Sequence, residues 1–542
     1  MATYALGLDF GTNSVRALLV DTATGVEAAT AVFNYPSGDQ GVYYDANDPN
    51  LARQNPLDYI AGIHAVTNDV LQASGISADD IVGVGVDTTG SSPLPIDANG
   101  VPLAAQPNFQ NNLDAMCWLW KDHTSFAEAE EITQKAAVYP YLAKIGGTYS
   151  SEWFWSKLLR CSRVAPLVFQ TAHTWVETCD FITGYLTGTL PLPKRSICAA
   201  GHKAMYSDDW NGLPAAEFLD SLEPALGDLA GRLYSKAYPS DELAGKITAE
   251  VAALTGLKEG TPVAVGAFDA HHGAVGAGIR EGTLVKIIGT STCDCMVHPK
   301  AEPIADIPGV CGITMSSVLP DFYGIEAGQS AVGDIFNWFV RYAGQTHDAL
   351  TAEAEKLQPG ESGLLALDWH NGNRTILVDP LLTGLIVGQT LHTTPAETYR
   401  ALIEATAFGA LMIVNRIEEY GVRIDQIINC GGIAERSPLV MQIYADVLNR
   451  PMKVSRSAQT CALGAAIFAS VVGGAHPDVL SAQAAMTGTK PHVFLPDTER
   501  AAIYGRLFAQ YQLLHDAFGR GSQVPLGHVM KELREIQRFA CP

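Results

Sequence analysis

The sequence predicts an α/β protein made of two similar domains that face each other across an active-site cleft. Its 542 residues are too many for one hydrophobic core, which favours two large domains. Each half of the chain also contains a short apolar strand that enters a Gly-Thr turn, first at Gly11 and Thr12 and again at Gly289 and Thr290. Because the second turn repeats the first, the pattern indicates a duplicated domain.

The first turn joins two apolar strands within residues 6–21. Gly11 allows backbone N–H groups to approach an anion closely, while Thr12 and Asn13 add hydroxyl and amide donors. Asp9 precedes this turn, and a carboxylate beside such donors predicts a hydrated Mg²⁺ that Asp9 orders through water. The alternative is a hairpin turn with no ligand.

A strand, helix and strand order continues the first half. Residues 56–73 have apolar side chains at helical spacing, and residues 81–87 form an apolar strand that runs into the polar loop Thr88 to Ser92. Ligands gather at such strand ends in open α/β sheets. Further along, residues 114–189 are predicted to be rich in helices and in tryptophan, most of it in the core.

The second half repeats this order and adds a Gly-Gly junction. Residues 263–269 are predicted to form a strand that ends at Asp269, and residues 284–288 a strand that enters the second Gly-Thr turn. A third strand ends at Gly431 and Gly432, and helical periodicity follows over residues 438–448. Because glycines let a flat ring lie against the backbone, these elements together predict ATP held across the domain interface.

Composition excludes several classes of partner. The net charge of −22 argues against binding to nucleic acid or to an anionic membrane, and no apolar run is long enough to span a bilayer. We therefore expect a cytoplasmic protein with a small-molecule substrate. The ten cysteines lack the spacing of a disulfide framework, and Cys293 and Cys295 lack the second pair that a structural zinc site requires.

Ordered motifs along the whole chain resemble those of the actin-like ATPase superfamily. GLDFGTNS, IIGTST and NCGGIAERSPLV are similar to its phosphate-1, phosphate-2 and adenosine motifs. Within that superfamily, GAFDAHHGAVGAG (266–278) and LTGLIVG (382–388) resemble the signatures of the FGGY carbohydrate kinases. The resemblance implies two actin-like, ribonuclease H-like domains, at residues 1–276 and 277–542, with ATP and Mg²⁺ as cofactors and a homodimer as the assembly.

The resemblance also assigns roles to residues, and it makes Asp269 the general base. Neighbouring His271 and His272 invite a metal assignment, but their side chains diverge and no third ligand follows at a useful spacing, which favours packing roles. Gly90, Lys203 and Glu326 match sugar-binding positions, and Asp269 contacts the sugar with them. Gly11, Thr12, Asn13, Gly289, Thr290, Gly431 and Gly432 match ATP-binding positions. Trp120, Asp122 and Trp153 are further candidates for facing the sugar, although core packing is the favoured interpretation for the two tryptophans.

Six further blocks, among them VDTTGSSPLPID (86–97) and GIEAGQSAVGDIFNWF (324–339), are similar to the family members that phosphorylate L-ribulose. The resemblance thus implies ATP-dependent phosphorylation of a 2-ketopentose at its 5-hydroxyl, as in L-arabinose catabolism. Another FGGY kinase, acting on D-ribulose, ribitol or xylulose, is the nearest alternative, because a linear sequence does not reveal hydroxyl stereochemistry. An actin-like ATP-gated switch is the alternative of another class, and it has no use for Asp269.

Overall fold

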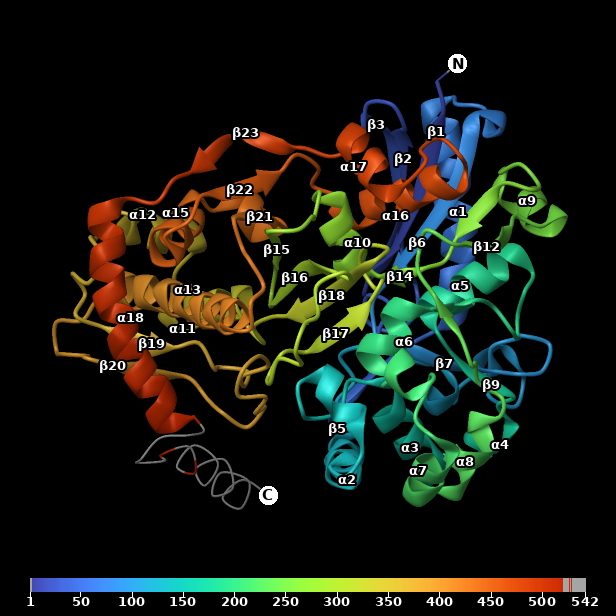
Figure 1. Cartoon of the computed structure of the whole chain (residues 1–542), viewed down its shortest axis with the longest axis horizontal. Helices are drawn as coiled ribbons and strands as arrows, with labels where there is room; N and C mark the ends of the chain where they lie inside the picture. The colour runs from blue at the N-terminus through green and yellow to red at the C-terminus, as the bar shows by residue number, and fades with distance from the viewer. Residues whose placement is uncertain (1, 520–525, 527, 529–542) are drawn as a thin grey trace.

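The computed structural model describes residues 2–519, 526 and 528, and its core consists of two mixed β-sheets lying side by side (Figure 1). The first sheet has the order β12-β13-β6-β1-β2-β3, with β14 paired to β6. Its strands are β1 (Tyr4–Phe10), β2 (Ser14–Asp21), β3 (Glu27–Asn34), β6 (Ile81–Thr88), β12 (Leu243–Lys246), β13 (Pro262–Ala264) and β14 (Ala267–Phe268).

The second sheet repeats this topology. Its order is β17-β18-β16-β15-β21-β22-β23, made of β15 (Thr283–Ile288), β16 (Thr292–Pro299), β17 (Gly312–Met315), β18 (Phe322–Ala327), β21 (Gln426–Cys430), β22 (Met452–Ser455) and β23 (Thr489–Phe494). In each sheet a central strand, β1 or β15, pairs antiparallel with the next strand in sequence and parallel with a later one. The predicted duplication of a ribonuclease H-like domain is confirmed.

Helices cover the outer faces of the two sheets. α1 (Pro56–Ser74) packs on β2 and β3, as its apolar spacing predicts, and Asn55 caps its first turn by accepting from the Leu57 N–H. In the second half, α13 (Pro395–Glu419), α15 (Pro438–Leu448) and α18 (Thr498–Phe518) pack together around a separate apolar core. The helix predicted over residues 438–448 is therefore confirmed.

A helical region extends from the first domain and contains the predicted tryptophan-rich segment. Its main helices are α2 (Phe126–Ala136), α3 (Phe154–Val164), α5 (Thr178–Thr187), α6 (Ile197–Lys203), α7 (Ala216–Leu222) and α8 (Pro224–Ala230). Trp118, Trp155 and Trp175 are fully buried in its core. In Figure 1 this region lies below the first sheet and beside the end of β17.

Two helices, α10 (Asp269–Gly276) and α16 (Thr460–Val472), lie between the sheets and share one apolar core with both of them (Figure 1). α16 comes from the second half of the sequence but packs on β1 and β6 of the first sheet. This close approach needs glycine, because a Cβ at Gly7 or Gly85 would lie 1.9 Å from a carbonyl oxygen of α16. The division between residues 276 and 277 stays a prediction.

One predicted strand is shorter than expected. Residues 263–269 were predicted to form a single strand, but the structure has β13 and β14 with a break between them, and Asp269 begins α10. Both short strands pair with β6 in the same sheet, and the chain leaves the sheet only after Phe268, so that the Asp269 carboxylate sits at a helix start beside the strand ends. The nine cysteines among the described residues are free thiols, as predicted.

Candidate active site

Three aspartates meet at one edge of the first sheet. Asp9 on β1 and Asp87 on β6 are direct neighbours in the parallel register, and Asp87 also pairs with Ala267, two residues before Asp269. Arg16 on β2 approaches Asp9, with 3.5 Å between its guanidinium and the carboxylate. Strand pairing therefore brings together side chains that are up to 260 residues apart in sequence.

These carboxylates hold protons more tightly than carboxylates in water. Burial, followed by the charges of Asp9 and Asp269, raises the pKa of Asp87 well above its ordinary value, and burial also raises the pKa of Asp9. The Asp87 side-chain oxygens accept no hydrogen bond from any donor among the described residues, although this carboxyl group lies against that of Asp9. Such a cluster has spare ligand atoms for a cation.

Asp87 was missed in the sequence, although a signal for it was present. Three segments share an apolar run that ends in aspartate, namely GLD at Asp9, GVD at Asp87 and AFD at Asp269. We assigned roles to the first and the third and treated Asp87 only as the end of a strand. The repeated strand ending in aspartate is the sequence signal that could have identified Asp87 as a site residue.

Asp269 is held at the first turn of α10. One carboxylate oxygen accepts from the N–H of Ala270 at 2.6 Å, which fixes the direction of the side chain. Burial, then repulsion from Asp9, raises the pKa of Asp269 to about 7. A carboxylate with a pKa near the working pH is suited to general base catalysis.

Gly90 packs against the ring of Phe268, the residue before Asp269. A Cβ at Gly90 would lie 1.8 Å from the ring of Phe268, so that only glycine fits at this position. The loop that carries Gly90 is fixed by two buried charged groups: Lys157 donates to the carbonyl of Ser91 at 2.7 Å, and Glu177 accepts from the N–H of Ser92 at 2.7 Å. Sequence reasoning assigned no role to this supporting pair.

Lys203 and Glu326 form an ion pair between the two halves of the chain. The ammonium group at the end of α6 lies 2.8 Å and 3.1 Å from the two carboxylate oxygens of Glu326 on β18, and Trp153 lies under it at 5.2 Å. Burial opposes ionisation of Glu326, but Lys203 lowers its pKa well below the ordinary value. Both also act electrostatically on Asp269, and His271, two residues after Asp269, lies 3.5 Å from Glu326, so the three predicted residues lie near one another.

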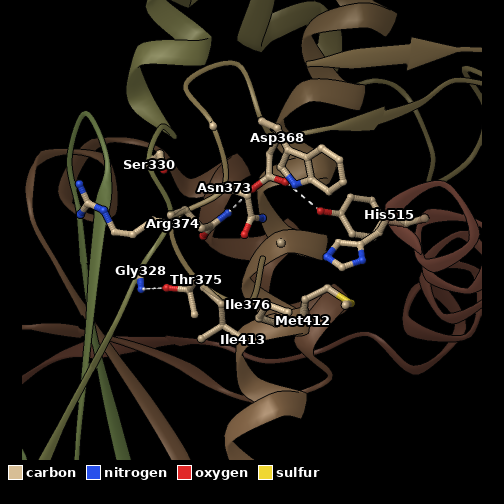
Figure 2. A pocket seen from close by; sticks show the side chains of 15 residues that line it. Gly328, Ser330, Asp368, Asn373, Arg374, Thr375, Ile376, Met412, Ile413 and His515 are labelled. Atoms are coloured by element: carbon tan, nitrogen blue, oxygen red, sulfur yellow. Dashed lines mark hydrogen bonds between the residues drawn. The ribbon is translucent and has the colours of Figure 1, made fainter. Parts of the chain in front are cut away.

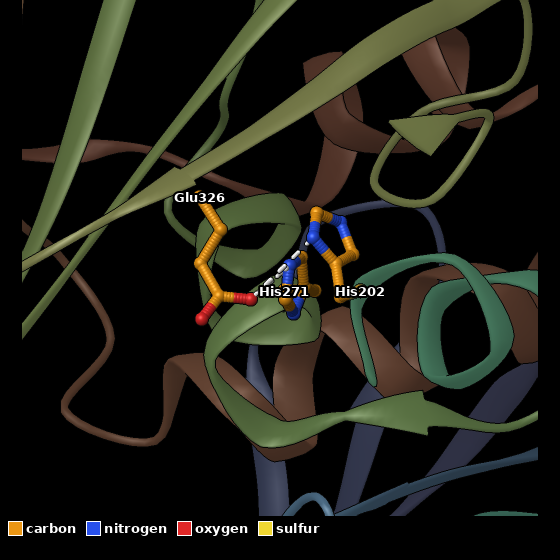
Figure 3. A group of neighbouring side chains, drawn as sticks. All are labelled: His202, His271 and Glu326. Carbon is orange, nitrogen blue, oxygen red and sulfur yellow. Dashed lines mark ion pairs between the residues drawn. The ribbon is translucent and has the colours of Figure 1, made fainter. Parts of the chain in front are cut away.

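Two histidines also approach Glu326 (Figure 3). His202 Nδ1 and His271 Nε2 lie 3.6 Å and 3.5 Å from one Glu326 oxygen, and burial lowers the pKa of both imidazoles. No third ligand follows His271 and His272 in the sequence, but the fold brings His202 and Glu326 to His271 from distant segments. Lys203 already neutralises that carboxylate, which disfavours a cation there.

Both predicted phosphate turns are partly exposed, and donors of the first turn are partly used in internal hydrogen bonds. The Gly11 N–H donates to Ser14 at 2.9 Å, and the Asn13 amide donates to the Gln40 carbonyl at 2.7 Å. The Thr12 hydroxyl accepts from the indole N–H of Trp120 at 3.0 Å. In this arrangement the Asn13 side chain is directed to Gln40.

The second turn and the Gly-Gly junction adjoin each other. Gly289 and Thr290 join β15 to β16 and accept hydrogen bonds from the segment that begins α11 (Gly333–Ala343). Gly431 ends β21 with φ at +91°, and a Cβ there would lie 2.5 Å from the Ile288 carbonyl oxygen. Because β15 and β21 are paired strands, their ends bring both glycine turns to the same edge of the second sheet.

Two candidates for sugar contacts have structural partners. Asp122 is fully buried and accepts from the N–H of Ala52 at 2.8 Å and from Arg53, so the expectation that it faces the sugar was wrong. Its carboxylate is already used to neutralise a buried guanidinium. Trp120 donates its backbone N–H to the Ser92 hydroxyl and its indole N–H to the Thr12 hydroxyl. These two hydrogen bonds link the loop of Gly90 to the first phosphate turn.

Fold and site together define a class of protein. Two copies of a ribonuclease H-like domain, glycine turns on both sheets and a buried aspartate of raised pKa constitute an actin-like ATPase fold with a phosphotransfer site. Sequence models of the FGGY family of carbohydrate kinases match residues 4–276 with their N-terminal domain and residues 284–472 with their C-terminal domain. The chain belongs to this family, and it is an ATP-dependent carbohydrate kinase.

Individual relatives agree with this assignment. A ribulokinase of Vibrio parahaemolyticus is 41% identical over 94% of this chain and 95% of its own length. A ribulokinase of Geobacillus thermodenitrificans is 40% identical over 99% of this chain and 98% of its own. Among solved structures, a xylulose kinase from Rhodospirillum rubrum has a TM-score of 0.78 at 24% identity, covering 95% of this chain and 99% of that one, and thus shares the fold.

Proposed function

We propose that this kinase transfers the γ-phosphoryl group of ATP to the 5-hydroxyl of a 2-ketopentose, with L-ribulose as the substrate and L-ribulose 5-phosphate as the product. The observation that carries the proposal is the grouping of Asp269, Lys203 and Glu326 in one buried site. Similarity to proteins named ribulokinase supports the choice of sugar.

Asp269 acts as the general base in this proposal. Its carboxylate is fixed by the Ala270 N–H and has a pKa of about 7, so it takes the proton of the primary hydroxyl as the new P–O bond forms. Lys203, Glu326 and the backbone at Gly90 hold the other hydroxyls. Orientation of this kind lowers the entropic cost of reaching the transition state.

In this proposal the glycine turns bind ATP. Gly11, Thr12 and Asn13 face the phosphates from the first domain, and Gly289 and Thr290 face them from the second. Gly431 and Gly432 contact the adenosine, at the position where the chain turns with φ at +91°. Asn13 contributes through its backbone while its amide donates to Gln40.

The aspartate cluster suits Mg²⁺. Asp87 has two buried oxygens that accept no hydrogen bond from the described residues, and Asp9 lies next to it at the rim of the cleft. Carboxylate oxygens and water are the ligands that Mg²⁺ prefers, so Asp9 would hold the hydrated ion, with Asp87 behind it. Bound there, Mg²⁺ would neutralise charge on the ATP phosphates.

We also infer the location, the assembly and the domain bounds of the enzyme. Within the part of the chain that the structure describes, no helix has the length and apolar character needed to cross a bilayer. We place the kinase in the cytoplasm as a homodimer, with a small sugar and ATP as its partners and no nucleic acid or membrane. We divide each chain into domains at 1–276 and 277–542.

A substrate panel tests this function. ADP release is measured with a coupled assay across the four 2-ketopentoses, ribitol and the other pentitols, with an ATP-only background. We expect L-ribulose to give the highest kcat/KM. Faster turnover of an alditol would contradict the substrate assignment, and ATP turnover indifferent to every sugar would contradict a kinase role and favour an ATP-gated switch.

A further inference from the structure

A second charged pair joins the two halves of the chain, in addition to Lys203 and Glu326. The Arg374 guanidinium, from the second domain, lies 3.6 Å from a carboxylate oxygen of Glu152, from the helical region of the first. This separation is too long for a hydrogen bond. The two side chains retain 30% and 20% of their exposure, so that both can reach a ligand.

The pair is adjacent to the predicted sugar site. Glu152 precedes Trp153, which lies under the Lys203 ammonium at 5.2 Å. Lys203 also acts electrostatically on Glu152, and Glu326 acts on Arg374. Glu326 also lies 3.5 Å from His271, two residues after Asp269, so the Arg374–Glu152 pair and the base both adjoin the Lys203–Glu326 pair.

The loop that carries Arg374 is firmly held. The next residue, Thr375, accepts from the N–H of Gly328 at 2.8 Å, and Gly328 follows Glu326 at the end of β18. Ile376 donates through its N–H to Gly309 at 2.8 Å. Arg374, Asp368 and His515 all line one small pocket, and in Figure 2 the Arg374 side chain points away from the other two. Arg374 is thus pre-positioned on a rigid support.

A 2-ketopentose matches the chemistry of this pair. Its end remote from the 5-hydroxyl carries a carbonyl, which only accepts hydrogen bonds, next to a hydroxyl, which can donate one. Arg374 only donates and Glu152 accepts. From this match we propose that Arg374 and Glu152 form a subsite that binds the hydroxyketone end of the sugar and selects ketoses. The proposal rests on the proposed function.

A sugar bound by Arg374 and Glu152 contacts both halves of the chain. Arg374 and Glu152 belong to different halves of the chain and already lie 3.6 Å apart, so a sugar that contacts both groups helps to hold the two halves together. Because hydrogen bonds to charged groups are among the stronger ones, loss of either partner should weaken sugar binding about tenfold or more. Once one partner is lost, removal of the second should weaken sugar binding little further, because both groups bind the same end of the sugar.

A double-mutant cycle tests the subsite. Binding of L-ribulose without ATP is measured by calorimetry for the wild type, Arg374→Met, Glu152→Gln and the double variant, and KM values for sugar and ATP are measured alongside. We expect each single variant to raise the Kd for L-ribulose about tenfold or more, the double variant to add less than threefold, and the KM for ATP to change less than twofold. Arg374→Lys, which keeps the charge but loses the planar fork, should bind weakly as well.

Arg423→Met is the matched control, because Arg423 carries the same charge on the exposed surface, paired with Asp425. It should leave sugar binding unchanged. Unaltered L-ribulose affinity in Arg374→Met and Glu152→Gln, or strictly additive losses, would overturn the subsite while leaving the kinase function intact. A wild type that neither binds nor phosphorylates any ketopentose would overturn both.

Discussion

At the scale of single residues, Asp269 combines a fixed direction with an unusual affinity for protons. Its neighbours explain this affinity, because burial and the charge of Asp9 oppose ionisation while the Ala270 N–H and Lys203 favour it. The result is a carboxylate with a pKa of about 7, about three units above its ordinary value. Proton transfer at neutral pH therefore depends on the surroundings of this one side chain.

Activity should follow the ionisation of Asp269. A base is active only when deprotonated, and its raised pKa means that a large fraction is protonated below pH 7. We expect kcat/KM for the sugar to fall about tenfold for each pH unit below about 6, with a midpoint near pH 7. A pH profile from 5.5 to 8.5 in a constant-ionic-strength buffer measures this, and a flat profile down to pH 5.5 would exclude the assignment.

At the scale of elements, the contact between α10 and α16 positions the catalytic helix. α10 begins at Asp269, and α16 packs across it and onto the first sheet. The two helices come close through glycine, since a Cβ at Gly464 would lie 1.8 Å from the His272 carbonyl oxygen. Any side chain at this position must push α10 away from α16.

The same Gly→Ala change should have opposite effects at two helix positions. Gly464→Ala in α16 should lower the free energy of unfolding by roughly 1–3 kcal/mol and reduce kcat, because α10 carries the base. Gly505→Ala in α18, where a Cβ would meet nothing within 4 Å, should raise stability by about 1 kcal/mol. Urea unfolding of both variants measures the difference, and equal effects at the two positions would refute the packing argument.

Elements with strong local signals were predictable, whereas contacts between distant segments were not. Apolar spacing predicted α1 and α15 within a residue, and the Gly-Thr endings located β1 and β15. The break between β13 and β14 has no such signal, because Val263 to Phe268 is apolar throughout. Glu152 and Arg374 were missed for another reason: a charged residue in a loop reveals its partner only when the fold brings the two together.

At the scale of the whole molecule, the site exists only because both halves contribute to it. Asp269 and Lys203 belong to the first half and Glu326 to the second, and the Lys203–Glu326 pair joins them. The sequence motifs already indicated that both halves contribute residues to the site, since the motifs occur in both halves of the sequence. They did not predict that α16 returns to the first sheet, because its apolar, small side chains are equally suited to either sheet.

In the proposed reaction, Asp269 activates the sugar hydroxyl. Asp269→Asn keeps the size of the side chain but removes its basicity, while the glycine turns assigned to ATP are untouched. The direct test compares L-ribulose-dependent ADP formation with ATP affinity in wild type and Asp269→Asn. We predict a loss of sugar phosphorylation of a thousandfold or more, on the order of 4 kcal/mol in the barrier, with ATP affinity within threefold of the wild type. Substantial sugar turnover by Asp269→Asn would contradict the account.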